Sequence, residues 1–98
     1  MDDDTLGGYE RVHARPPAFG GADGFAYTVS ILVEDEPGAR DQYGAALLFL
    51  RWSTGGERPI GHVETDYLAY GATPDAARAA LAQLSLHDVK RHLDLLTT

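Results

Sequence analysis

The chain has 98 residues, with eight basic against fifteen acidic side chains, a formal net charge of -7 and no cysteine. This length supports one domain with one modest core, and the missing cysteines exclude disulfides and thiolate metal sites, so a cytoplasmic protein is expected. The acidic balance disfavours duplex nucleic acid or an anionic membrane as partner, because phosphate binding needs clustered Lys and Arg.

The chain begins with residues 1–8, MDDDTLGG, which are acidic where a secretion signal is basic and then apolar. We expect a flexible acidic tail there and a single domain over residues 9–98. No apolar run approaches the roughly 20 residues that a membrane-spanning helix needs. The alternation in residues 9–15, YERVHAR, predicts a short edge strand, which Pro16 and Pro17 end because they lack backbone donors.

Three further strands are predicted from alternating apolar residues. In residues 25–35 the expected core-facing side chains are Phe25, Tyr27, Val29, Ile31 and Val33. Residues 43–52, YGAALLFLRW, are apolar on both faces, which is typical of a central strand whose two faces are both covered. Residues 60–70 return as a fourth strand after a glycine-rich turn.

The C-terminal third predicts helix. Thr73 is a suitable N-cap and Pro74 suits the first helical position. Ser85 and Asp88 form a capping-box-like pair that indicates a restart or a kink. The predicted fold is therefore α+β, an antiparallel four-stranded meander packed on one face by a C-terminal helix or helical hairpin.

The helices of this predicted fold leave one apolar face of the central strand uncovered. Leu48, Leu50 and Trp52 alternate with Leu47 and Phe49, and helices that follow the sheet cover only one of these two faces. We expect Leu47 and Phe49 to lie on the uncovered face. A second copy of the chain is the simplest cover, so a homodimer is predicted.

The most conspicuous polar pattern is HVETD, residues 62–66, which sets His62, Glu64 and Asp66 on one face of a strand. His62 and Asp66 would be about 13 Å apart, too far for one metal ion to bind all three. We interpret the row as a solvated or interface surface, with a metal-dependent hydrolase as an alternative. Leu68 and Tyr70 share its parity, so either a bulge near Asp66 switches faces or the row meets a partner; we expect the strand to pass from an exposed to a buried half.

Catalytic motifs are not found. The chain has no cysteine, no G-x-S-x-G and no phosphate-binding loop, so we predict no catalytic residue, no metal and no cofactor. A second functional alternative is a small nucleotide-like ligand, because aromatic rings and guanidinium groups both offer flat stacking surfaces. The residues that would form this platform are Tyr43, Arg51, Trp52 and Arg58.

Residues 68–81, LAYGATPDAARAAL, resemble the strand-to-helix junction of the HicB-like antitoxin fold, and the hairpin over residues 43–70 fits the same plan. The acidic, proline-bearing segment that the family has before this glycine is replaced here by HVETD, and the strand at 9–15 and the second helix are additional. The resemblance implies a dimeric sheet module that binds and silences a protein partner. The expected function is thus a non-enzymatic protein-binding module of antitoxin, immunity, inhibitor or adaptor type.

Overall fold

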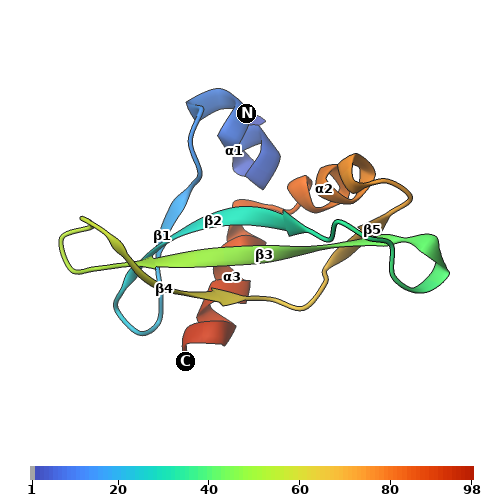
Figure 1. Cartoon of the computed structure of the whole chain (residues 1–98). Coiled ribbons are helices and arrows are strands. Elements are labelled where there is room, and N and C mark those ends of the chain that lie inside the picture. Colours follow the sequence, from blue (N-terminus) through green and yellow to red (C-terminus); the bar gives the residue numbers. More distant parts are fainter. Residues whose placement is uncertain (1) are drawn as a thin grey trace.

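The computed structural model describes the backbone of residues 2–98 and the side chains of residues 3–98 (Figure 1). In chain order its elements are η1 (Asp2–Asp4), α1 (Leu6–His13), β1 (Ala18–Gly20), β2 (Ala26–Val33), η2 (Ala39–Asp41), β3 (Tyr43–Trp52), β4 (Pro59–Glu64), β5 (Ala69–Gly71), α2 (Pro74–Ala82) and α3 (Leu86–Thr97). The strands form one antiparallel sheet in the order β1-β2-β3-β4, and β5 pairs with β3. The predicted α+β class with an antiparallel meander and C-terminal helices is confirmed.

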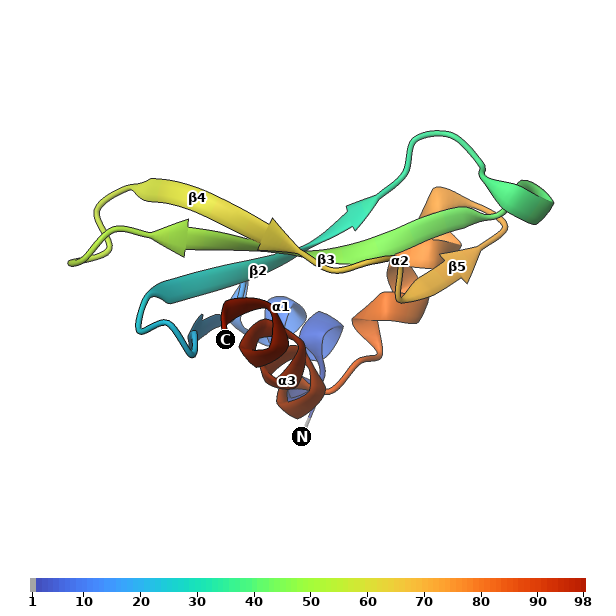
Figure 2. The ribbon, with the colours of Figure 1, turned by 90° about the horizontal axis from the view of Figure 1, so that it is seen from below.

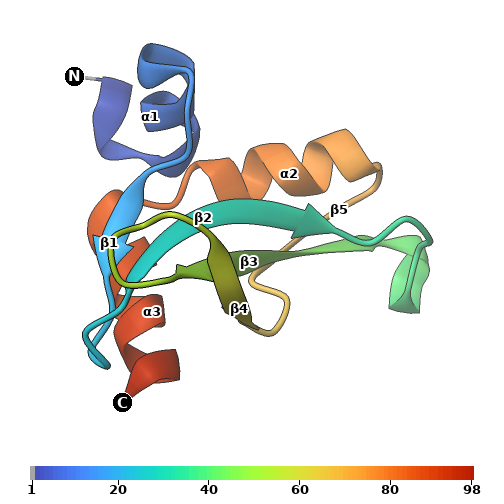
Figure 3. The same ribbon diagram turned by 60° about the vertical axis from the view of Figure 1, so that its left-hand side comes forward.

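The core lies between the helices and one face of the sheet. Figure 2 shows α1 and α3 together on one side of the sheet, and Figure 3 shows α2 running along β2. Every second residue of β2 and β3 points into this layer, as strand alternation requires. The buried side chains are Tyr27, Val29, Ile31, Ala45, Leu47 and Phe49 from the sheet and Leu6, Ala77, Leu81, Val89 and Leu93 from the helices.

The predictions for the N-terminal region are wrong. Residues 6–13 form α1 instead of a tail and a strand, and Leu6 is fully buried. Thr5 caps the helix, since its Oγ1 accepts the N–H of Gly8 at 3.0 Å. The backbone N–H of Leu6 donates to the carbonyl of Leu84 at 2.9 Å. This anchor to the α2–α3 link, together with the cap, outweighs the short alternation on which the strand prediction depended. Met1 lies outside the described residues.

The predicted strand over residues 60–70 is interrupted. Leu48 lies opposite Glu64, whereas Ala45 lies opposite Ala69, so the outer strand contains two more residues than β3 over this stretch. Thr65 bridges the gap: its N–H donates to the carbonyl of Leu47, and its Oγ1 accepts the N–H of Leu47, both at 3.0 Å. The N–H of Leu68 then donates to the carbonyl of Ala45 at 2.8 Å.

Two inserted residues leave the alternation of side chains unchanged, because strand periodicity is two. Tyr70 therefore stays on the same face as Glu64 and is 56% exposed. A break near Asp66 does occur, but the expected passage of Leu68 and Tyr70 into a buried half is wrong.

The C-terminal helix boundaries agree with the sequence. Thr73 Oγ1 accepts the N–H of Ala76 at 3.0 Å, with Pro74 in the first turn. Ser85 Oγ accepts the N–H of Asp88 at 3.1 Å, and α3 begins directly after it. The predicted restart is confirmed, because two separate caps start two separate helices.

Candidate functional site

The predicted interface positions Leu47 and Phe49 are core residues. Both side chains are 0% exposed, so neither faces a partner as expected. The reason is their pairing: Phe49 lies opposite Val29 and Leu47 opposite Ile31, the inward-facing residues of β2. Cross-strand neighbours point to the same face, so β2 decides which of the two apolar faces of β3 is covered.

The opposite side of the sheet, which we call the open face, carries the even-numbered residues of β3. None of the described helices packs its buried residues against this side. Trp52 Nε1 donates to Thr28 Oγ1 at 2.9 Å, which holds the indole across β2 and β3. Other side chains that alternation places on the open face include Leu32, Ala46, Leu48, Leu50, His62, Glu64 and Tyr70.

One end of the open face contains a groove of about 460 Å³. Its floor is Ala46, which is 2% exposed. Its walls are Leu32 and Glu34 on the β2 side and Glu64, Thr65, Asp66, Tyr67 and Tyr70 on the β4–β5 side. We call this feature the tyrosine groove.

The two tyrosines owe their position to the interruption between β4 and β5. Their ring centroids are 6.1 Å apart, with the ring planes at 66°, an edge-to-face pair. The Tyr67 ring lies over Gly44 of β3, where an added Cβ would come within 2.7 Å of the ring atoms. Glycine at position 44 therefore lets the ring rest on the strand, and Tyr67 remains 41% exposed.

The charges around the tyrosine groove are acidic. Glu34, Glu64 and Asp66 line it, and Glu36 lines an adjoining hollow of about 510 Å³ that shares Glu34 and both tyrosines. Among the side chains of residues 3–98, no Lys, Arg or His lines either hollow, and none of these carboxylates forms an ion pair. Arg40 lines a third hollow, which shares Tyr70 with the tyrosine groove.

The structure places only two of the three residues in the predicted polar row on the same strand face. His62, Glu64 and Asp66 are all exposed. His62 and Glu64 lie on the open face opposite Leu50 and Leu48, while Asp66 belongs to the interruption. Among the described side chains, those of residues 3–98, no three His, Asp or Glu are grouped closely enough to hold a metal ion.

The structure does not bring the predicted stacking platform together. Tyr43 and Trp52 begin and end β3, so about 30 Å of strand separates them. Arg51 points to the helix-covered side, opposite Tyr27, whereas Trp52 is on the open face. Arg58 lies in the turn after Trp52, where its N–H donates to Ser53 Oγ at 3.3 Å.

Arg51 is instead part of a polar cluster that the sequence did not suggest. Its Nε donates to the Tyr27 hydroxyl oxygen at 2.6 Å, and that hydroxyl donates to Asp23 Oδ2 at 2.6 Å. The Arg51 guanidinium carbon lies 5.4 Å from the ring centroid of Phe25 and 5.5 Å from that of Tyr27. The Tyr27 hydrogen bond lowers the pKa of Asp23, while burial raises the pKa of Tyr27. The cluster ties the β1–β2 turn to β3, and its polar groups satisfy one another.

The lowered pKa of Asp23 predicts a pH effect on stability. In the folded protein the Asp23 carboxylate stays ionised at pH values below 3.8, the ordinary pKa of an aspartate, because its own pKa is lowered. The carboxylate therefore stabilises the fold above pH 3.8, and this contribution is lost as the pH falls through the folded pKa. Asp23→Asn should therefore flatten the loss of stability below about pH 4. Urea midpoints measured between pH 2 and 6 test this. Asp35→Asn, which removes one exposed charge from the β2–β3 connection, is the control; matching profiles for the two variants would contradict the assignment.

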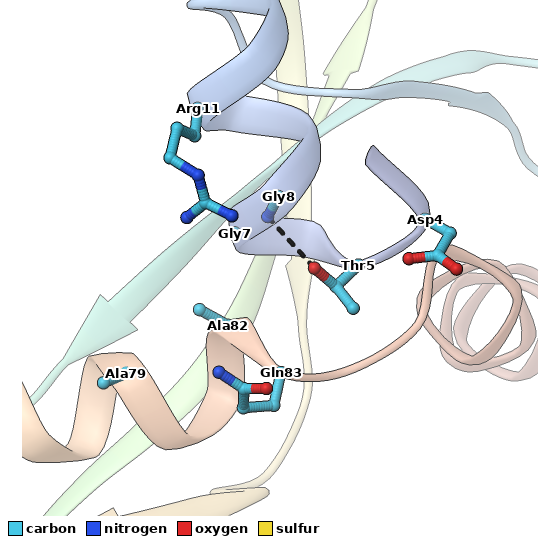
Figure 4. Close-up of a pocket in the computed structure, with 8 residues that line it drawn as sticks. All are labelled: Asp4, Thr5, Gly7, Gly8, Arg11, Ala79, Ala82 and Gln83. Carbon is cyan, nitrogen blue, oxygen red and sulfur yellow. Dashed lines mark hydrogen bonds between the residues drawn. The ribbon is translucent and has the colours of Figure 1, made fainter. Parts of the chain in front are cut away.

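A separate hollow, about 380 Å³, lies between α1 and α2 (Figure 4). Arg11 extends from α1 toward the side of α2 that carries Ala82. Three of the first four helical N–H groups are already used: that of Leu6 donates to the carbonyl of Leu84, that of Gly8 to Thr5 Oγ1 and that of Tyr9 to the carbonyl of Thr5. An added Cβ on Gly7 would lie 2.8 Å from the Ala82 Cβ, so these small residues serve the close approach of the helices.

No protein-family model matches this chain, and comparison with curated proteins and with solved structures gave no match. No helix within residues 2–98 is long and apolar enough to cross a bilayer. The open face and the tyrosine groove are therefore the features of the molecule that indicate a function.

Proposed function

We propose that this protein is a non-enzymatic, cytoplasmic interaction module that binds another protein through its open face, in the manner of an antitoxin, immunity protein, inhibitor or adaptor. The observation that carries the proposal is the apolar surface on the side of the sheet away from the helices. The half-buried side chains of Leu48, Leu50 and Trp52 lie along β3 on this side, and the exposed rings of Tyr67 and Tyr70 lie on the same side near the other end of the strand. Apolar and aromatic residues bordered by charges are typical of protein-binding surfaces.

The resemblance of residues 68–81 to the HicB-like antitoxin fold favours the same class, since it implies a sheet module that binds and silences a protein partner. The chemistry of the open face supports a different protein as partner in preference to a second copy. Two copies packed face to face about an axis parallel to β3 would bring Glu34, Glu64 and Asp66 of one chain toward the same carboxylates of the other, which disfavours that arrangement.

The proposal is tested by Leu50→Glu, which places a charge on the open face outside the tyrosine groove. The control is Leu95→Glu, a change of the same kind at a 72% exposed leucine of α3. Tagged wild-type protein and both variants are cross-linked in source lysate, and captured proteins are quantified by mass spectrometry. We expect one stoichiometric partner, reduced about tenfold or more by Leu50→Glu and retained by Leu95→Glu.

Thermal melting of each variant shows whether the fold persists, and light scattering gives its size. Equal capture by Leu50→Glu and Leu95→Glu would place the binding surface elsewhere. A wild-type dimer that Leu50→Glu converts to a monomer, with no other protein captured, would replace the proposed partner by a second copy of the chain.

A further inference from the structure

We infer that the tyrosine groove receives a basic segment of the partner protein, with an arginine guanidinium between the carboxylates and the tyrosine rings. This inference rests on the proposed function and specifies the chemistry of the partner. The groove presents Glu34, Glu64 and Asp66 around the faces of Tyr67 and Tyr70. Carboxylates bind guanidinium groups through paired N–H donors, and aromatic faces attract them through the ring quadrupole.

The chain already contains one arginine guanidinium that is bound by aromatic rings and a carboxylate, that of Arg51. Around Arg51, the guanidinium lies over the rings of Phe25 and Tyr27, and its Nη2 is 3.5 Å from Asp23 Oδ2. The Arg51 cluster combines two aromatic rings with one carboxylate, and the tyrosine groove combines two aromatic rings with three, yet no Lys, Arg or His of the described chain lines the groove. The groove is thus complementary in charge to a cationic side chain of another molecule.

The charge distribution favours a basic protein segment over an anion or an acidic surface. With a net charge of -7 the protein attracts basic surfaces over a distance, and the four carboxylates near the two tyrosines concentrate that attraction at one end of the open face. The apolar floor and walls, Ala46 and Leu32, suit the alkyl stem of a long basic side chain.

The first test uses a fluorescein-labelled hexa-arginine peptide, with hexaglutamate as the negative probe, and fluorescence anisotropy at low and physiological salt. Glu34→Gln combined with Glu64→Gln should weaken hexa-arginine binding on the order of tenfold at low salt. Glu10→Gln combined with Glu57→Gln changes the net charge equally, away from the groove, and should change binding less than about twofold. Equal weakening by the two pairs would overturn the inference, because the overall charge would then explain binding.

The second test isolates the rings. Tyr67→Leu keeps every carboxylate, and we expect about threefold weaker binding of hexa-arginine with a smaller effect on hexalysine. No change in either peptide would overturn the role of the ring. Tyr9→Leu, in α1, is the control for loss of a tyrosine away from the groove, at a half-buried position.

Binding of the natural partner by two variants distinguishes failure of this inference from failure of the proposed function. If Leu50→Glu releases the partner while the Glu34 and Glu64 double variant retains it at wild-type affinity, the open face binds the partner and the groove assignment is wrong. Release by both supports the inference. Retention of the partner by both variants overturns the inference and the proposed function together.

Discussion

Phe49→Glu is expected to unfold the protein. The Phe49 side chain is 0% exposed and lies between Val29 of β2 and Val63 of β4, beneath the helices. Removing a buried phenylalanine alone costs about 3 to 5 kcal/mol, and a carboxylate buried there without a partner adds several more. Because small domains are stable by only about 5 to 15 kcal/mol, little folded protein should remain. Far-ultraviolet circular dichroism and the dispersion of a one-dimensional proton spectrum measure this directly.

The matched variant is Leu50→Glu, one residue further along β3. The chemical change is similar, but Leu50 lies on the open face opposite Thr28 and His62, so the new carboxylate remains hydrated. We expect a cost below about 1.5 kcal/mol and a cooperative thermal transition. If Phe49→Glu melts at the same temperature as Leu50→Glu, the assignment of the two faces of β3 is wrong.

The contrast between Phe49 and Leu50 shows which features of the fold can be predicted from the sequence. The bounds of β3, the core-facing row of β2 and both C-terminal helix caps were predictable, because alternation and capping are properties of a few adjacent residues. Which face of β3 is buried was not. Both faces are apolar, and the choice is made by pairing with β2, whose inward face is less ambiguous.

The tyrosine groove was hidden from the sequence for a similar reason. The sequence suggested a polar row at His62, Glu64 and Asp66 and, as one alternative, a bulge near Asp66, but nothing local indicated that the outer strand would contain two residues more than the facing part of β3. The position of the Tyr67 ring depends in turn on glycine at position 44, which is 23 residues earlier in the chain. The available hint was the shared parity of Tyr70 with the polar row, which strand alternation alone does not resolve.

A second large effect is expected at the strand-to-helix junction, where Gly71→Ala should destabilise the fold by about 3 kcal/mol. Gly71 is buried at the end of β5, and an added Cβ would lie 2.4 Å from the backbone nitrogen of Ala77 and 2.7 Å from the carbonyl carbon of Ala76. These are helix backbone atoms, so no side-chain rotation relieves the overlap. Helix α2 must move away from β5, and Ala77 and Leu81 then lose part of their packing in the core.

Urea unfolding of Gly71→Ala should therefore show a lower midpoint than wild type, with α2 as the displaced element. Gly20→Ala in β1 is the control, since a Cβ at that position has no neighbour within 4 Å. We expect that change to shift the free energy of unfolding by less than about 1 kcal/mol, because the added methyl group only restricts the unfolded chain. Equal midpoints for the two variants would mean that β5 does not hold α2 at this distance. The placement of Tyr70, which is next to Gly71 and lines the tyrosine groove, would then need revision as well.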